Sequence, residues 1–173
     1  MKLCMIGTGY VGLVSGVCFA DIGNQVICVD KDKNKIDKLN SGISPIYEPG
    51  LDELIKKNYI AKRLSFTTNI DNAINSSDII FICVGTPTRK GSIKVDLSFV
   101  YKCTKEILKF SKRKKIIVTK STVPVGTGDE IEKIVKRKKK LFTVISNPEF
   151  LREGEAIRAV SYTHLTLPTK RIV

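Results

Sequence analysis

The fold of this chain is decided by the stretch KLCMIGTGYVG, residues 2–12. Its first five residues form an almost continuous apolar run, which is typical of a strand covered on both faces. Three glycines with the spacing GxGxxG follow at once. Gly7 permits a tight turn, Gly9 lets the backbone approach a bound group, and Gly12 lets a helix lie close to the strand. The stretch therefore predicts a strand, a tight turn and a helix that begins near Tyr10.

Apolar runs of strand length recur along the chain and are separated by segments of helical length. Besides residues 2–6, the predicted strands are 25–29, 64–67, 79–84, 115–119 and 141–145. The predicted helices are 10–22, 33–39, 50–57, 71–75, 97–110 and 127–136. This alternation predicts the α/β fold class, as a doubly wound parallel sheet of the Rossmann type with helices on both faces.

Asp30 directly follows the second predicted strand, where dinucleotide-binding folds place the acid that reads the adenosine ribose. The helix start at Tyr10 and Val11 offers free amides and a positive dipole end to a pyrophosphate. A carboxylate accepts hydrogen bonds from the ribose hydroxyls and repels a 2′-phosphate, so NAD is favoured over NADP. NADP remains an alternative, because Lys31 or Lys35 could accommodate a 2′-phosphate. The glycine turn by itself is also compatible with FAD or with no bound ligand.

Composition limits the functions that are open to the chain. Its 173 residues have room for one ordinary core, and 42% hydrophobic with 27% charged residues is typical of a folded domain. The single histidine, His164, leaves little for histidine-based catalysis, and we predict no metal centre. The net charge of +13 comes largely from residues 101–140. We expect a solvated helical face and no specific nucleic-acid partner, because aromatic interleaving and a binding motif are missing.

The five cysteines show no CxxC pair, and Cys4, Cys28 and Cys83 lie in apolar runs where thiols behave as small hydrophobes. This usage is typical of a reducing compartment, so we expect a cytoplasmic protein. The apolar stretches are too short for a membrane span. Neither a targeting segment nor a membrane partner is predicted.

Ligands of a doubly wound sheet lie beyond the carboxyl ends of its strands, so the residues after each strand matter most. Thr86 and Thr122 stand in the loops after the fourth and fifth predicted strands, and Glu149 and Glu153 follow the sixth. Taken singly, each threonine could be a turn hydroxyl and each glutamate a solvated acid of a first helical turn. Their shared position makes them candidates for one site.

Motifs in these loops and in the glycine turn resemble those of a known family. They are GTGYVGLV (7–14), VD (29–30), PIYEPGL (45–51), VGTP (84–87), STVPVGT (121–127) and NPEFLREG (147–154). As a set they resemble the NAD-binding half of the nucleotide-sugar 6-dehydrogenases, the UDP-glucose/GDP-mannose dehydrogenase family, over residues 1–159. The resemblance implies oxidation of a sugar C6 alcohol to a carboxylate in two hydride transfers to NAD, through a thioester on a catalytic cysteine.

The resemblance also implies roles for individual residues. Thr122 and Glu153 would hold the water that hydrolyses the thioester, and Glu149 would assist proton transfer and place the sugar. Phe150 and Leu151 would help Glu149 to line the sugar site. The implied cofactor-binding residues are Gly7, Gly9, Tyr10, Val11, Gly12, Asp30, Lys35, Thr86, Thr122 and Glu153.

Other parts of the family pattern have no counterpart in this sequence. They are the glycine-rich motif of the nucleophilic cysteine, the central helix through which the family forms homodimers, and the C-terminal nucleotide-sugar domain. Residues 160–173 depart from the family as an atypical tail, either a loop and edge strand or foreign sequence. We therefore expect an NAD-binding domain at 1–159 that does not complete turnover alone.

The loop PIYEPGL favours UDP-glucose, oxidised to UDP-glucuronate for polysaccharide biosynthesis, as the substrate of the whole enzyme. Dehydrogenases of GDP-mannose or of UDP-N-acetyl sugars remain alternatives. In this family the residues that select the substrate lie largely in the half that is missing here. A further alternative is an NAD-binding module without catalytic activity.

Overall fold

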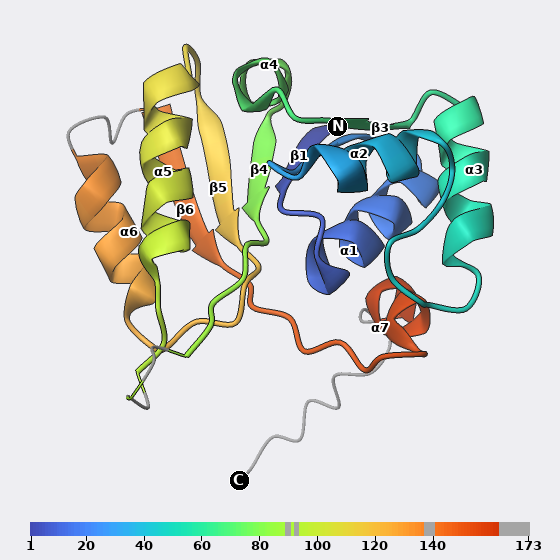
Figure 1. Cartoon of the computed structure of the whole chain (residues 1–173). Helices are drawn as coiled ribbons and strands as arrows, with labels where there is room; N and C mark the ends of the chain where they lie inside the picture. Colours follow the sequence, from blue (N-terminus) through green and yellow to red (C-terminus); the bar gives the residue numbers. More distant parts are fainter. Residues whose placement is uncertain (89–90, 92–93, 137–140, 163–173) are drawn as a thin grey trace, which may run out of the picture.

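A computed structural model describes residues 1–88, 91, 94–136 and 141–162. Its centre is a sheet of six strands in the order β3-β2-β1-β4-β5-β6, and every neighbouring pair is parallel (Figure 1). The doubly wound α/β fold is thereby confirmed. The strands are β1 (Lys2–Ile6), β2 (Gln25–Val29), β3 (Leu64–Thr67), β4 (Ile79–Ile82), β5 (Lys115–Thr119) and β6 (Phe142–Ser146).

The helices bury the two faces of the sheet in two separate apolar clusters. They are α1 (Tyr10–Asp21), α2 (Lys33–Asn40), α3 (Leu51–Ile60), α4 (Ile70–Ser76), α5 (Ser98–Phe110), α6 (Thr127–Val135) and α7 (Ala156–Tyr162). One cluster contains Met5 and residues of α1, α2, α3 and α7, and the other contains Cys4 and residues of α4, α5 and α6. Adjacent strand residues point to opposite faces, so both faces need apolar side chains.

Helix α1 lies unusually close to the sheet because it carries glycines where it touches the strands. A Cβ on Gly12 would stand 2.0 Å from the carbonyl oxygen of Gly7, and a Cβ on Gly16 would stand 2.8 Å from the Sγ of Cys28. Larger residues at these points would push the helix outward. The close packing brings the start of α1 to the carboxyl end of β1.

The register of the strands aligns their carboxyl ends. Ile6 pairs with Val29 and with Ile82, Ile82 pairs with Thr119, and Thr119 pairs with Ser146. These five residues form one row across the sheet. The loops that follow β1, β2, β4, β5 and β6 therefore all begin at the same edge.

The structure differs from the sequence predictions at the ends of some strands and helices. Strand β4 ends at Ile82 rather than at residue 84, because the hydroxyl of Ser121 donates to the carbonyls of Val84 (2.7 Å) and Ile82 (3.2 Å). Strand β6 begins and ends one residue later than predicted, at Phe142–Ser146. Helix α1 ends at Asp21 rather than at residue 22, and α3 extends to Ile60.

Helix α7 was not predicted. It includes residues 160–162, where the sequence predicted either a loop and edge strand or foreign sequence. These three residues are helical, and the foreign origin of the tail stays a prediction. The helix forms because Ala156 is fully buried in the cluster around α1, and Ile157 packs against that cluster. Residues 163–173, including His164, lie outside the described part of the chain.

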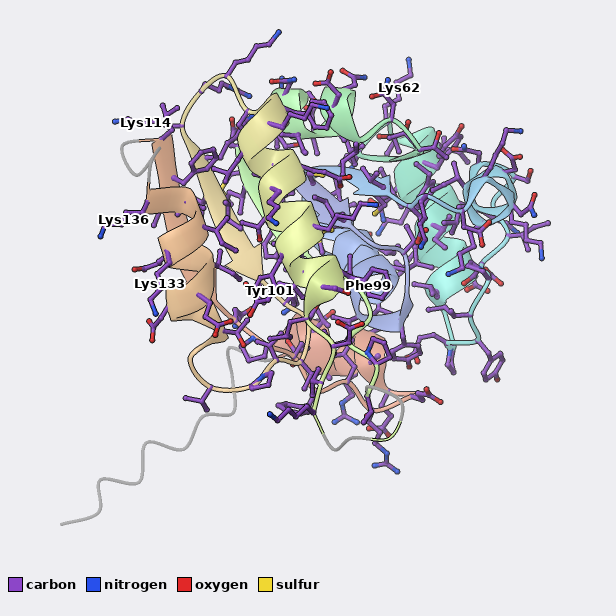
Figure 2. All side chains as sticks on the ribbon, turned by 60° about the vertical axis from the view of Figure 1, so that its left-hand side comes forward. Lys62, Phe99, Tyr101, Lys114, Lys133 and Lys136 are labelled. Carbon is purple, nitrogen blue, oxygen red and sulfur yellow. The ribbon has the colours of Figure 1, made fainter. Side chains whose placement is uncertain are left out.

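The basic stretch lies on the side of α5 and α6. Figure 2 shows Lys114, Lys133 and Lys136 extending outward there. Because Lys114 directly precedes β5 and Lys136 follows α6, these charges lie toward the amino ends of the strands, away from the aligned carboxyl edge. Within the described residues, no helix combines the length and the apolar character that a bilayer crossing requires.

Candidate functional site

The turn between β1 and α1 is tight on one side and open on the other. Gly7 has φ +104°, and a Cβ on it would stand 2.5 Å from the carbonyl oxygen of Cys83. Its amide donates to the carbonyl of Val29 at 2.7 Å, which ties the turn to β2. A Cβ on Gly9 would meet nothing within 4 Å. The turn is therefore pressed against the sheet at Gly7 and leaves room for a ligand at Gly9.

Asp30 is fixed to this turn by Thr8. The Oδ2 of Asp30 accepts from the amide (2.9 Å) and the hydroxyl (2.7 Å) of Thr8, which is 1% exposed, and Oδ1 accepts from the amide of Asp32 at 3.1 Å. Burial raises the pKa of Asp30, but the hydrogen bonds from Thr8 and Asp32, with the charge of Lys35, outweigh it and lower the pKa below its ordinary value. Asp30 is therefore an ionised carboxylate at neutral pH.

These residues fit the adenosine ribose and the pyrophosphate of a dinucleotide. A carboxylate has about four lone-pair sites, and Thr8 and Asp32 use three of those on Asp30, which leaves one on Oδ1 for a ribose hydroxyl. Helix α1 has no side-chain cap, so its first amides are available to an anion beside Gly9. Tyr10 and Val11 are the first two residues of that helix.

Lys31 and Phe99 bring another element to the same end of the site. The Nζ of Lys31, the residue after Asp30, lies 5.4 Å from the centre of the Phe99 ring at the start of α5, which is labelled in Figure 2. This contact joins the loop after β2 to α5. Lys35 is half-buried in α2 and acts on Asp30 through its charge.

Lys120, which sequence reasoning did not select, holds the predicted carboxylate Glu149. Its Nζ donates to Glu149 Oε2 at 3.0 Å and to Asn147 Oδ1 at 3.1 Å, and the lysine side chain is only 4% exposed. The amide of Glu149 donates back to the carbonyl of Lys120 at 3.3 Å. The sequence contained one indication of the Lys120–Glu149 pair. Lys120 directly follows an apolar strand, at the edge of the sheet where ligands bind.

The other predicted residues lie at the same edge in different surroundings. The hydroxyl of Thr86 donates to the carbonyl of Thr122 at 2.9 Å, which joins the loops after β4 and β5. The side chains of Thr122 and Glu153 are exposed. Phe150 is 80% exposed, whereas Leu151 packs against the cluster around α1. The predicted site residues therefore converge on one edge of the sheet, but Phe150 and Leu151 face different environments.

Tyr10 is directed to Glu48, a residue that sequence reasoning did not select. The Tyr10 hydroxyl donates to Glu48 Oε2. Burial, and then the hydrogen bond to Glu48, raise the pKa of Tyr10 to about 12. The phenol is therefore neutral and is engaged by the protein, and the backbone of Tyr10 is the part available to a cofactor.

The cysteines do not supply a nucleophile. All five are free and buried. Burial raises the pKa of Cys18 and Cys103 to about 11 and that of Cys83 to about 12, and it also raises those of Cys4 and Cys28. Thiols of this kind are chemically inert. Across the part of the chain that the structure describes, no group of three or more His, Cys, Asp or Glu side chains could hold a metal ion.

The parallel sheet, the glycine turn and the ionised carboxylate beside it are typical of a dinucleotide-binding domain of the doubly wound class. The model of the UDP-glucose/GDP-mannose dehydrogenase family, NAD binding domain, matches residues 1–166. The chain belongs to this family, and its cofactor is NAD. The resemblance carried by the loop motifs is thereby confirmed.

Curated relatives and solved structures agree with this assignment. The chain is 55% identical to the UDP-glucose 6-dehydrogenase of Rhizobium meliloti over 159 residues, which cover 91% of this chain and 36% of the relative. The structure of GDP-mannose dehydrogenase from Pseudomonas aeruginosa matches with TM-score 0.85 and 38% identity, over 92% of this chain and 38% of that one. A UDP-glucose dehydrogenase from Pyrobaculum islandicum matches with TM-score 0.84 and 36% identity, over 91% and 38% of the two chains. The chain thus spans about a third of the length of the curated relatives it matches.

Proposed function

We propose that this chain is the NAD-binding part of a UDP-glucose 6-dehydrogenase, which oxidises UDP-glucose to UDP-glucuronate. Relatives of that name are 55% and 54% identical to it. The observation that carries the proposal is the arrangement of the carboxyl edge. There the ionised Asp30, after β2, stands beside the glycine turn, while Lys120, three strands along and after β5, holds Glu149.

One group of residues binds the cofactor and another group binds the sugar. NAD, when bound, supplies the hydride acceptor. Gly7, Gly9 and Gly12 shape the turn for the pyrophosphate, the amides at Tyr10 and Val11 bind it, and Asp30 accepts from the ribose hydroxyls, with Lys35 and Thr86 beside the cofactor. The family resemblance and the geometry of the turn support these roles.

On the sugar side, Glu149 accepts a proton and places the sugar, and Lys120 orients that carboxylate through the 3.0 Å ion pair. Thr122 and Glu153, exposed at the same edge, hold the water that hydrolyses the thioester. Phe150 and Leu151 contribute backbone groups to the sugar site. The nucleophilic cysteine belongs to a part of the enzyme with no counterpart in this sequence, because all five thiols here are buried.

The proposal extends to compartment and assembly. Five buried free thiols support a reducing compartment, so we place the protein in the cytoplasm. The whole enzyme is a homodimer, as the family resemblance implies.

Isothermal titration with NAD and NADP tests the cofactor half of the proposal. We expect NAD to bind and NADP to bind at least about tenfold more weakly, because the charge of Asp30 opposes a 2′-phosphate. No binding at millimolar NAD would overturn the proposal.

The absorbance of NADH tests the catalytic half, with UDP-glucose, GDP-mannose and UDP-N-acetylglucosamine as alternative substrates. We expect this chain to bind NAD and to produce no NADH alone. Robust turnover by these 173 residues would refute the need for a cysteine outside them. Addition of the C-terminal part of a UDP-glucose 6-dehydrogenase should restore NADH production with UDP-glucose, whereas the same part of a GDP-mannose dehydrogenase should not restore it with GDP-mannose. The reverse result would favour GDP-mannose as the substrate.

A further inference from the structure

The carboxylate of Glu48 is buried and accepts hydrogen bonds from two distant segments of the chain, the start of α1 and residues 154–157. Glu48 lies between α2 and α3 and is 6% exposed. Its Oε1 accepts from the amides of Ala156 (2.8 Å) and Ile157 (3.4 Å), and its Oε2 accepts from the amide of Gly154 (2.8 Å) and from the hydroxyl of Tyr10. Every lone-pair direction of this carboxylate therefore has a donor.

The donors belong to the two parts of the proposed site. Tyr10 is the first residue of α1, directly after the glycine turn. Gly154 closes the loop that carries Glu149 and Glu153, and Ala156 and Ile157 open α7. In Figure 1 this segment leaves β6 and crosses below the sheet to α7, which lies beside α1.

Two further features stabilise the contact between Glu48, Tyr10 and Gly154. The amide of Gly154 also donates to the Tyr10 hydroxyl at 3.1 Å, so it is shared between Tyr10 and Glu48. Gly154 has φ +86°, a conformation that turns its amide toward the carboxylate and that favours glycine. Burial raises the pKa of Glu48, but the hydrogen bonds from Tyr10 and from the three amides outweigh it and lower the pKa below its ordinary value.

We propose that Glu48 is a positioning residue that docks the loop bearing Glu149 and Glu153 onto the first turn of α1. The docking sets the distance between the pyrophosphate end of the cofactor site and the carboxylates of the sugar side. This role rests on the proposed function, because it assigns the loop to the nicotinamide and sugar end of the site. The adenosine end, made by the glycine turn and Asp30, does not contact Glu48.

The substitution Glu48→Gln tests the proposal in this chain. A glutamine offers one acceptor oxygen and turns an NH₂ donor toward backbone donors, so it breaks part of the contact at almost constant volume. By isothermal titration we expect the affinity for NAD to fall about tenfold, because charge-assisted hydrogen bonds that hold the loop are lost. The affinity for ADP, which carries the adenosine and the pyrophosphate but no nicotinamide ribose, should change less than about twofold, because the glycine turn and the backbone amides at Tyr10 and Val11 are unchanged. The matched control is Glu53→Gln, an exposed acid of the first turn of α3, which should change neither affinity.

Equal losses for NAD and ADP would overturn the proposal, because they would show a general effect on the fold or on the glycine turn. An unchanged NAD affinity would also overturn it. Tyr10→Phe provides a second variant if Glu48→Gln does not fold. It removes one donor, leaves the three amides, and should weaken NAD about threefold without affecting ADP.

Amide hydrogen exchange separates this inference from the proposed function, since it needs no ligand. Glu48→Gln should speed exchange at Gly154, Ala156 and Ile157 while the amides of β1 and β2 keep their protection. If the wild-type chain bound neither NAD nor ADP, the proposed function would fail, and the exchange result would still decide whether Glu48 docks the loop. Unchanged exchange at these three amides would refute the docking.

Discussion

Gly7 and Asp30 both shape the turn between β1 and α1, but they do so in different ways. Gly7 contributes by lacking a side chain, since its φ of +104° and the 2.5 Å separation of an added Cβ from the Cys83 oxygen leave no room for one. Asp30 contributes a charge that Thr8 fixes in place. Substitutions at the two residues should therefore separate the stability of the fold from the affinity for the cofactor.

Gly7→Ala should destabilise the domain. We expect the free energy of unfolding to fall by about 2–4 kcal/mol, because an unfavourable φ adds to a backbone clash. Urea unfolding followed by circular dichroism measures this. Gly85→Ala is the matched control, since an added Cβ there meets nothing within 4 Å and its φ is not positive. A loss of similar size in both variants would contradict the reason given for Gly7.

Asp30→Asn should weaken NAD binding by about 10–100-fold, because a hydrogen bond to a charged group contributes about 1.5–3 kcal/mol. The preference for NAD over NADP should narrow, since the repulsion of the 2′-phosphate disappears. Titration calorimetry with both cofactors measures the two effects. Asp37→Asn, which removes only an exposed partner of Lys33, should leave both affinities within about twofold. An unchanged NAD affinity in Asp30→Asn would place the ribose elsewhere.

At the scale of the elements, the important contacts join loops rather than helices. Lys120 ties the loop after β5 to the loop after β6, and Thr86 ties the loop after β4 to the loop after β5. Each loop begins at the aligned edge of the sheet. A chain of loop-to-loop bonds thus supports the side chains at this edge of the sheet.

Lys120→Met should lower the free energy of unfolding by about 2–3 kcal/mol, because it leaves Glu149 and Asn147 without their buried cation. Chemical denaturation measures the loss, and a double-mutant cycle with Glu149→Gln isolates the pair. Lys33→Met, which breaks an exposed ion pair within α2, should cost less than about 0.5 kcal/mol. Additive effects in the cycle would show that Lys120 and Glu149 do not support each other.

At the scale of the whole molecule, three carboxyls that accept hydrogen bonds make stability depend on pH. Hydrogen bonds from Lys57 and Asn58 lower the pKa of Asp21, and the pKa values of Asp30 and Glu48 are lowered as well. A carboxyl whose pKa is lower in the folded protein contributes stability above its unfolded pKa. That contribution is lost as the pH falls through the folded pKa.

The free energy of unfolding should therefore decrease as the pH falls below the ordinary values of 4.5 for Glu48 and 3.8 for Asp21 and Asp30. Thermal unfolding between pH 7 and pH 3 measures this dependence. The triple variant Asp21→Asn, Asp30→Asn, Glu48→Gln should be less stable at neutral pH and show a flatter slope. A slope equal to that of the wild type would mean that other groups govern acid unfolding.

The five thiols provide a second test of the whole fold. Because all five are buried with raised pKa values, the native protein should react with Ellman's reagent far more slowly than a free thiol does. In urea, five equivalents should react at once. A cysteine that reacts rapidly in the native state would contradict both the burial and the proposal that none of these five thiols is the nucleophile.

The sequence predicted most of the fold, and it selected the glycine turn and Asp30, which the structure places side by side. Four strands, β1, β2, β3 and β5, were predicted with the observed bounds, because continuous apolar runs in a parallel sheet are local signals. Gly7, Gly9 and Asp30 were selected for the same reason, since their spacing sets their geometry. Helix α7 was missed because it depends on the burial of Ala156 and on amides bound by Glu48, more than a hundred residues away in the chain.

By itself the sequence determined the class of fold, the dinucleotide turn and the preference for NAD, because these follow from residues that are close together in the chain. Only the tertiary structure decided that Thr8 fixes Asp30, that Lys120 holds Glu149, and that Glu48 joins the first turn of α1 to the loop after β6. The physical reason is that a buried charge must find its partners wherever the fold places them. Those partners come from distant segments that carry no shared local pattern.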